Sequence, residues 1–202
     1  MKLVLVGTGY VGLVSGSCFA EFGYEVICVD KDKSRILELK KGKCPFFEPG
    51  IEELLLKHRD QTKLLSFTSS LPEAMESADI IFITVGTPSK RLEEDADLSA
   101  VWNVAKDIAN NIKKYTLVVT KSTVPVGTTK EIKKIISKIV PKENFDVVSN
   151  PEFLREGSAI NDFMRPDRII IGTDNEKSTK IMKELYRPLY LLETPIITST
   201  IE

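Results

Sequence analysis

The sequence contains few of the residues that bind metals or form disulfides. Its 202 residues include one histidine, His58, and three cysteines, Cys18, Cys28 and Cys44, which are odd in number and lack the spacing of metal ligands. A disulfide framework and a zinc site are therefore disfavoured. Because Cys18 and Cys28 fall inside apolar segments, we expect reduced, buried thiols in a cytoplasmic protein. His58 lies at a charged helix end, where we expect a solvated side chain without a catalytic role.

An excess of charge of one sign and long apolar runs are also absent. The 28 basic and 29 acidic side chains nearly cancel, so nucleic acid and anionic membranes are disfavoured as partners. No apolar stretch is long enough to span a bilayer, and Met1 begins a predicted strand rather than a signal peptide. Without internal repeats or a flexible linker, the chain suits one large α/β domain, or one domain plus the start of another.

The first thirty residues form a complete β-turn-α-β unit. Residues 2–6 predict a buried parallel strand, residues 13–22 a helix that stops at Gly23, and residues 25–29 a second strand that ends at Asp30. The turn between the first strand and the helix has the GxGxxG spacing and consists of Gly7, Thr8, Gly9, Tyr10, Val11 and Gly12.

Each part of this unit has a physical role in binding a dinucleotide. Gly7 allows a tight turn, Gly9 leaves room for a pyrophosphate, and Gly12 lets the helix pack close to the sheet. The N–H groups at the helix start, together with the helix dipole, form an anion site. Asp30 can accept hydrogen bonds from both hydroxyls of an adenosine ribose, and its charge disfavours a 2′-phosphate. This context favours NAD binding over a merely structural turn.

The rest of the chain continues to alternate between strands and helices. We expect strands at residues 64–68, 79–85, 117–120, 145–149, 168–172 and 195–198, and helices at 31–41, 51–58, 98–112, 129–139 and 177–186. Residues 43–50 and 89–97 have the composition of loops. The alternation predicts a Rossmann-like α/β fold, a doubly wound and mostly parallel sheet with helices on both faces.

Polar segments follow several of the predicted strands, at the edge where ligands bind in doubly wound sheets. Besides the glycine loop they are VGTPS (residues 85–89), KSTVPVGT (121–128) and NPEFLREG (150–157). The hydroxyls of Thr87 and Thr123 suit a ribose, a nicotinamide or a bound water, or alternatively a backbone cap. Glu152 and Glu156 suit a general base near a nicotinamide, and we expect both to face the cleft. Alternatively, either glutamate pairs with Arg155 in a surface turn.

The chain resembles the UDP-glucose/GDP-mannose dehydrogenase family of sugar-nucleotide dehydrogenases. The resemblance rests on GTGYVG, FFEPGIEELL, VGTPS, STVPVGTT and NPEFLREGSAINDFMRPDRIIIG, which together span Met1 to about Gly172. The last and most specific segment is more similar to the branch that acts on UDP-glucose than to the GDP-mannose branch. The resemblance implies an NAD-dependent, two-step oxidation of UDP-glucose at C6 to UDP-glucuronate, for polysaccharide biosynthesis.

The same resemblance implies roles for individual residues. The cofactor would be held by Gly7, Thr8, Gly9, Tyr10, Val11, Gly12, Asp30, Arg35, Val85, Gly86, Thr87, Pro88, Ser89, Ser122, Thr123, Val124 and Glu156. The UDP-sugar would face Glu152, Phe153, Leu154, Arg155 and Glu156, and the catalytic residues would be Thr123, Glu152 and Glu156.

The sequence departs from the family pattern in one respect. The family's nucleophilic cysteine, in a GFGGxC segment, and its lysine and asparagine partners have no counterpart in these 202 residues. We therefore expect residues 1–202 to be the NAD-binding domain of a longer enzyme, inactive alone, with a central helix, a UDP-sugar domain and homo-oligomer contacts beyond residue 202. The alternatives are a UDP-N-acetyl-hexosamine or GDP-mannose dehydrogenase, a non-catalytic NAD-binding regulator, or another two-domain NAD enzyme such as a 3-hydroxyacid dehydrogenase.

Overall fold

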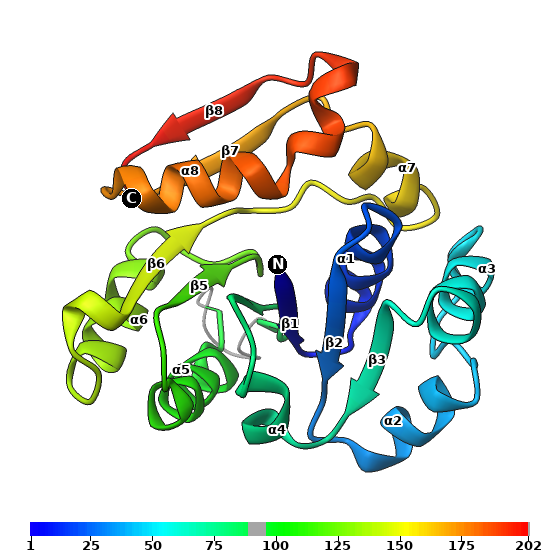
Figure 1. Cartoon of the computed structure of the whole chain (residues 1–202), viewed down its shortest axis with the longest axis horizontal. Coiled ribbons are helices and arrows are strands. Elements are labelled where there is room, and N and C mark those ends of the chain that lie inside the picture. The colour runs from blue at the N-terminus through cyan, green and yellow to red at the C-terminus, as the bar shows by residue number, and fades with distance from the viewer. Residues whose placement is uncertain (89–95, 202) are drawn as a thin grey trace.

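A computed structural model describes residues 1–88 and 96–201, and within them eight strands form one sheet (Figure 1). The strand order is β3-β2-β1-β4-β5-β6-β7-β8. Neighbouring strands are parallel except β6 and β7, which meet in antiparallel register at Ser149 and Gly172. The strands are β1 (Lys2–Val6), β2 (Glu25–Val29), β3 (Leu65–Thr68), β4 (Ile80–Ile83), β5 (Thr116–Thr120), β6 (Phe145–Ser149), β7 (Ile169–Gly172) and β8 (Ile196–Ser199).

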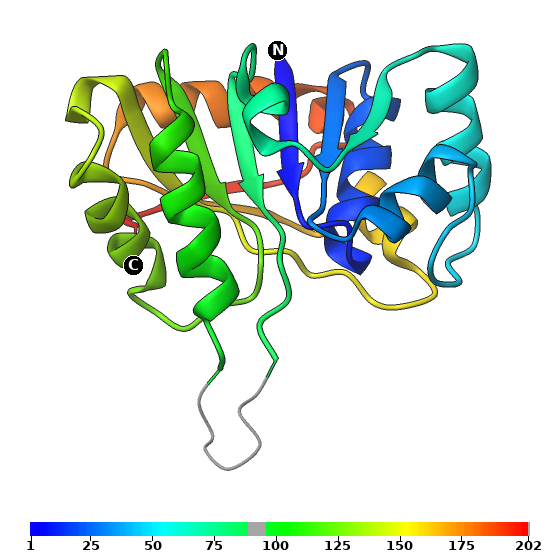
Figure 2. The same cartoon turned by 90° about the horizontal axis from the view of Figure 1, so that it is seen from below.

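Helices cover both faces of this sheet, and Figure 2 shows the same layers from below. One face packs on α1 (Tyr10–Glu21), α2 (Lys33–Lys40), α3 (Ile51–Leu56), α7 (Ala159–Met164) and α8 (Glu176–Leu185). The other face packs on α4 (Leu71–Met75), α5 (Ser99–Asn111) and α6 (Thr128–Ser137). Three irregular turns complete the described elements: the π-helix η1 (Lys57–Gln61) and the 3₁₀ helices η2 (Lys142–Asn144) and η3 (Arg187–Leu192).

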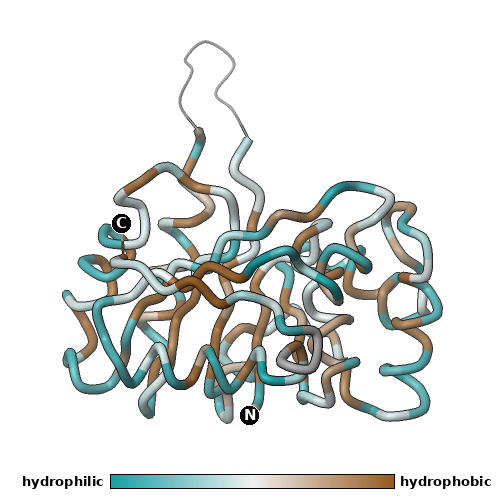
Figure 3. Tube along the Cα trace, turned by 90° about the horizontal axis from the view of Figure 1, so that it is seen from above, coloured by the Kyte–Doolittle hydropathy of each residue, from teal (hydrophilic) through white to brown (hydrophobic). Residues whose placement is uncertain are grey.

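The two faces enclose two separate apolar cores. Successive side chains of a strand point to opposite faces, so β4 sends Ile80 and Phe82 into one core and Ile81 and Ile83 into the other. A strand that is buried on both faces must be apolar throughout, which is why β4 and its neighbours appear as continuous hydrophobic runs in the sequence. The surface helices instead alternate hydrophobic and hydrophilic stretches along the trace (Figure 3). The predicted doubly wound, mostly parallel sheet is confirmed.

Two short helices were not predicted. Helix α4 has five residues, with Ser70 as its side-chain cap and a proline in its first turn. Helix α7 has six residues and no side-chain cap from its own N-cap residue, Ser158. Neither is long enough to show a helical period, so both depend on contacts that local sequence does not reveal.

The prediction of a solvated His58 is wrong. Its side chain lies in η1 and is only 2% exposed, with Nε2 2.6 Å from Glu21 Oε2 and Nδ1 3.0 Å from Thr62 Oγ1. The charged neighbours in sequence suggested solvent, but the end of α1 brings a carboxylate to the imidazole. Among the described residues, no helix is both long and apolar enough to cross a membrane, and no three His, Cys, Asp or Glu side chains are placed to hold a metal.

Candidate functional site

The glycine loop joins β1 to α1 in a tightly packed turn. Gly7 has φ +110° and donates its N–H to Val29 O at 2.8 Å. A Cβ added at Gly7 would lie 2.8 Å from Thr84 O, and one at Gly12 would lie 1.9 Å from Gly7 O. Both glycines therefore let the first turn of α1 close onto the ends of β1 and β4.

Gly9 differs from these two glycines, because a Cβ at Gly9 would have no neighbour within 4 Å. Gly9 is the N-cap residue of α1 and has extended backbone angles, and the helix has no side-chain cap and no acidic residue in its first turn. The first N–H groups of a helix have no partner within the helix, and no side chain from the N-cap residue bonds to them here. An uncapped helix start next to an open glycine has the chemistry to bind an anion.

Asp30 lies at the end of β2 beside this loop. Its Oδ2 accepts hydrogen bonds from the Thr8 N–H at 2.8 Å and the Thr8 hydroxyl at 2.7 Å, while Oδ1 accepts from the Asp32 N–H at 3.0 Å. The Arg35 guanidinium lies 3.6 Å from Oδ2. Burial alone would raise the pKa of Asp30, but these hydrogen bonds and Arg35 together hold it below its ordinary value. Asp30 is thus a fixed carboxylate, and it also braces the loop.

A cavity of about 800 Å³ opens between the glycine loop, the ends of β2 and β4, and α5. This volume is typical of small-molecule sites. The cavity brings together several of the predicted cofactor residues, namely Gly7, Gly9, Asp30, Arg35, Val85 and Gly86.

The next two strand-end loops are tied to each other. Thr87 Oγ1 donates to Thr123 O at 2.8 Å, and Ser122 Oγ donates to Val85 O at 2.7 Å. The hydroxyl of Thr87 is therefore used as a backbone tether, which was the alternative expected for it. Val124 packs on the core beneath α5 and α6, and Pro88 is exposed, while Ser89 lies outside the described residues.

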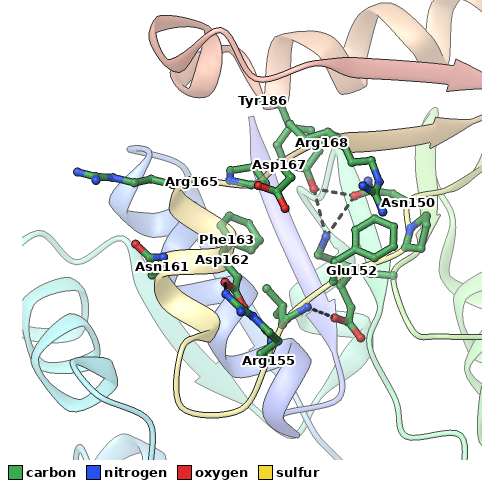
Figure 4. Close-up of a pocket in the computed structure, with 16 residues that line it drawn as sticks. Asn150, Glu152, Arg155, Asn161, Asp162, Phe163, Arg165, Asp167, Arg168 and Tyr186 are labelled. Atoms are coloured by element: carbon green, nitrogen blue, oxygen red, sulfur yellow. Dashed lines mark hydrogen bonds and ion pairs between the residues drawn. The ribbon is translucent and has the colours of Figure 1, made fainter.

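Glu152 lies where these loops meet the segment after β6. Its Oε1 accepts from Thr123 Oγ1 at 3.3 Å, and its Oε2 accepts from the Leu154 N–H at 2.6 Å. It lines a second cavity, of about 410 Å³, together with Phe153, Leu154 and Arg155 (Figure 4). Glu156 is exposed and does not line this cavity; its charge acts on Tyr10 at the start of α1.

Arg155 does not pair with either glutamate, so that expected alternative is wrong. Its guanidinium forms a bidentate contact with Asp162, with Nη2 2.7 Å from Oδ1 and Nε 3.1 Å from Oδ2. The partner lies in α7, a helix that the sequence pattern did not reveal. This pair raises the pKa of Arg155 and lowers the pKa of Asp162.

Lys121 has no predicted role, yet it is one of the most buried charged residues of the site. Its side chain follows β5, is 4% exposed, and places Nζ 3.4 Å from Asn150 Oδ1 and 3.3 Å from the Tyr186 hydroxyl. The Tyr186 hydroxyl also donates to Asn150 at 2.6 Å (Figure 4). Burial lowers the pKa of Lys121 to about 8, against the opposing charge of Glu152. The sequence feature that could have predicted a place for Lys121 in the site is its position directly after the apolar strand β5.

Replacing Lys121 by methionine is expected to raise the free energy of unfolding at pH 7 by about 1–3 kcal/mol, because it removes a buried ammonium and keeps the side-chain volume. Below pH 8 the lysine is protonated in both states, so the folded protein bears the full desolvation penalty. Above pH 8 the folded lysine loses its proton before the unfolded one does, so wild-type stability rises and the advantage of the variant shrinks.

Urea unfolding at pH 7 and pH 9.5 measures both effects. The matched control is Lys114→Met, which removes an exposed ammonium paired with Asp79 and is expected to change stability by about 1 kcal/mol or less. A Lys121→Met protein less stable than wild type at pH 7 would contradict the prediction.

The three cysteines are free thiols, and none is suited to be a nucleophile. Cys18 and Cys28 are buried as predicted, and burial raises the pKa of each to about 12. Burial also raises the pKa of the half-buried Cys44. A nucleophilic thiol needs a lowered pKa and access to the substrate, and all three lack the first of these.

Comparisons with known proteins agree with this geometry. The family model described as "UDP-glucose/GDP-mannose dehydrogenase family, NAD binding domain" matches residues 1–190. The chain is 52% identical over 202 residues to UDP-glucose 6-dehydrogenase of Rhizobium meliloti (strain 1021), covering 99% of this chain and 46% of that protein. It is 47% identical over 203 residues to UDP-glucose 6-dehydrogenase TuaD of Bacillus subtilis (strain 168), covering 100% of this chain and 43% of that protein.

Solved structures give the same result. A ternary complex of GDP-mannose dehydrogenase from Pseudomonas aeruginosa superposes with TM-score 0.93 at 38% identity, covering 100% of this chain and 47% of that one. A UDP-glucose dehydrogenase from the archaeon Pyrobaculum islandicum superposes with TM-score 0.92 at 37% identity, covering 99% and 46%. The chain thus spans less than half the length of these relatives.

Proposed function

The chain belongs to the UDP-glucose/GDP-mannose dehydrogenase family as its NAD-binding domain, and we propose that it serves an enzyme that oxidises UDP-glucose to UDP-glucuronate in two hydride transfers to NAD. One observation carries the proposal: an uncapped helix start beneath an open Gly9 and a fixed Asp30 carboxylate share one cavity. The proposal names UDP-glucose because the two curated relatives reported above, at 52% and 47% identity, are UDP-glucose 6-dehydrogenases. The two solved structures do not discriminate, since the GDP-mannose enzyme is 38% identical and the UDP-glucose enzyme 37%.

The residues present fit the dinucleotide. The glycine loop, Gly7 to Gly12, would hold the pyrophosphate through backbone N–H groups, and Asp30 with Arg35 would hold the adenosine ribose. The other end would lie toward the two tethered loops, with Thr87, Ser122, Thr123 and Val124. When bound, NAD supplies the hydride acceptor. The open Gly9, whose Cβ direction is unoccupied within 4 Å, supports this placement.

The sugar would face the segment from Glu152 to Glu156, and Glu152 would take the proton of the sugar hydroxyl. Thr123 donates to Oε1 of Glu152 and so holds this carboxylate toward the loop cluster. A protein that only senses NAD has no need of a carboxylate fixed in this way, which disfavours the regulator alternative. We place the nucleophilic thiol outside residues 1–202, because burial raises the pKa of the cysteines of this chain.

We accordingly assign turnover, a UDP-sugar domain and homo-oligomer contacts to a longer enzyme. Residues 1–202 would form one domain of that enzyme, which is inactive alone. We assign the enzyme to the cytoplasm, because all three cysteines are free thiols. We assign no nucleic-acid or membrane partner to residues 1–202, because their basic and acidic side chains, 28 and 29, nearly balance.

The choice of cofactor tests the proposal. We expect NAD⁺ to bind the 202-residue chain at least about 10-fold more tightly than NADP⁺, because the fixed charge of Asp30 repels a 2′-phosphate. Calorimetric titration with both dinucleotides measures the ratio. Asp30→Asn should reduce the preference for NAD⁺ over NADP⁺. The matched control is Asp107→Asn, which changes an exposed carboxylate on the α5 side of the same cavity and should leave the preference unchanged. Equal or tighter binding of NADP⁺ by the wild type would refute the role of Asp30.

A further inference from the structure

The FFEPG segment, residues 46–50, lies between the glycine loop and the start of α7 and does not itself line either cavity. The Phe46 ring packs on the Tyr10 ring with centroids 4.9 Å apart, and Glu48 is only 4% exposed. Phe47, between them, is 87% exposed. Gly50 has φ +84° and is the N-cap residue of α3. The segment thus places one carboxylate inside the protein, although no described lysine or arginine forms an ion pair with it.

The buried Glu48 carboxylate is held by hydrogen-bond donors from two distant segments. Oε1 accepts from the Ala159 N–H at 2.8 Å and the Ile160 N–H at 3.4 Å. Oε2 accepts from the Gly157 N–H at 2.8 Å and from the Tyr10 hydroxyl. Three of these donors lie at the start of α7, so Glu48 supplies the cap that Ser158 does not.

Tyr10 connects this cap to the glycine loop. It is the first residue of α1, where its backbone belongs to the proposed pyrophosphate site, and its hydroxyl also accepts from the Gly157 N–H at 3.1 Å. Burial first, and then the hydrogen bond to Glu48, raise the pKa of Tyr10 above its ordinary value. The phenol therefore stays protonated and remains a donor to Glu48.

We propose that Glu48 is a positioning residue that clamps residues 157–160, which directly follow the proposed sugar-facing residues 152–156, to the glycine loop, so that dinucleotide binding at α1 orders residues 157–160. The clamp follows from the contacts of Glu48, Tyr10 and the three backbone N–H groups. The coupling to the dinucleotide rests, in addition, on the proposed function. In this proposal the FFEPG motif supplies the Glu48 carboxylate, which accepts hydrogen bonds from both the glycine loop and residues 157–160.

The ligand-free chain tests the clamp. In Glu48→Gln the side chain keeps its size, but its amide nitrogen cannot accept a hydrogen bond, so the N–H groups lose the charge of the carboxylate and one of its two acceptor oxygens. We expect amide hydrogen exchange at Gly157, Ala159 and Ile160 to become about 10- to 100-fold faster. This factor corresponds to the stabilisation that is lost with a charge-assisted hydrogen bond. Exchange in α5 reports global stability, so an acceleration at residues 157–160 that exceeds the acceleration in α5 identifies a local effect.

Two further variants keep this test decisive. Glu53→Gln, an exposed glutamate on α3, is the matched control and should leave all three rates unchanged. Tyr10→Phe removes only the phenol hydroxyl, so it should accelerate exchange at Gly157 even where Glu48→Gln fails to fold. Unchanged rates in Glu48→Gln, or in Tyr10→Phe, would overturn the clamp.

Repeating the exchange with saturating NADH tests the coupling. In the wild type we expect NADH to slow exchange at the start of α1 and at residues 157–160. In Glu48→Gln the slowing at residues 157–160 should be lost while that at α1 remains. Equal slowing of residues 157–160 in both proteins would overturn the coupling. If NADH protects nothing in the wild type, the proposed function and the coupling both fail, and the ligand-free comparison still decides the clamp.

Discussion

Replacing Gly9 by valine is expected to abolish NAD binding and leave the fold intact. Gly9 has no neighbour within 4 Å of its Cβ direction and has φ −71°, so the protein itself accommodates a side chain there. The space that valine would fill is the approach to the uncapped N–H groups of α1, where a pyrophosphate must come close to the backbone. We expect the dissociation constant to rise by about 100-fold or more, equivalent to about 2.7 kcal/mol.

Calorimetric titration with NADH, together with thermal unfolding, separates the two possible effects of this change. Gly12→Val is the contrasting variant, because its Cβ would lie 1.9 Å from Gly7 O and must displace the loop. It should lose both binding and thermal stability, whereas Gly9→Val should lose binding alone. Retained affinity in a folded Gly9→Val protein would mean that the glycine loop is only a turn.

The central strands were predictable because a strand that is buried on both faces of a sheet consists mostly of apolar residues. In β4 and β5 every residue is buried, so the apolar runs mark the strands directly. The glycine loop and Asp30 were predictable for another reason, since the GxGxxG spacing and the acid after the second strand lie within one unit of thirty residues. Topology then placed the polar loops of four strand ends on one edge.

The remaining features depend on partners that are far away in the sequence. His58 is buried because its imidazole contacts Glu21 at the end of α1. Arg155 pairs with Asp162, although Glu152 and Glu156 are nearer to it in the sequence. Helix α7 begins where it does because Glu48 caps it across 111 residues of chain. A local pattern carries no information on such contacts, and a resemblance transfers roles only to positions that match a known motif.

Replacing Glu152 by glutamine is expected to lower the turnover number by about 100- to 10,000-fold in an enzyme that joins this chain to its sugar-binding half, because it removes a general base. The Michaelis constant for UDP-glucose should stay within a few-fold. Glutamine keeps an oxygen for the Leu154 N–H, and its amide nitrogen can donate to Thr123 Oγ1, so the shape of the segment is preserved. What is lost is the capacity to take a proton.

The measurement is NADH absorbance at saturating NAD⁺ with UDP-glucose varied, for the wild type, Glu152→Gln and Glu156→Gln. Glu156 lies in the same segment but is exposed and does not line the cavity beside Thr123, so its variant should lose less turnover. An interaction made only in the transition state lowers the turnover number and the specificity constant together. A Glu152→Gln effect confined to the Michaelis constant would instead assign Glu152 to binding the sugar, and the proton would need another acceptor.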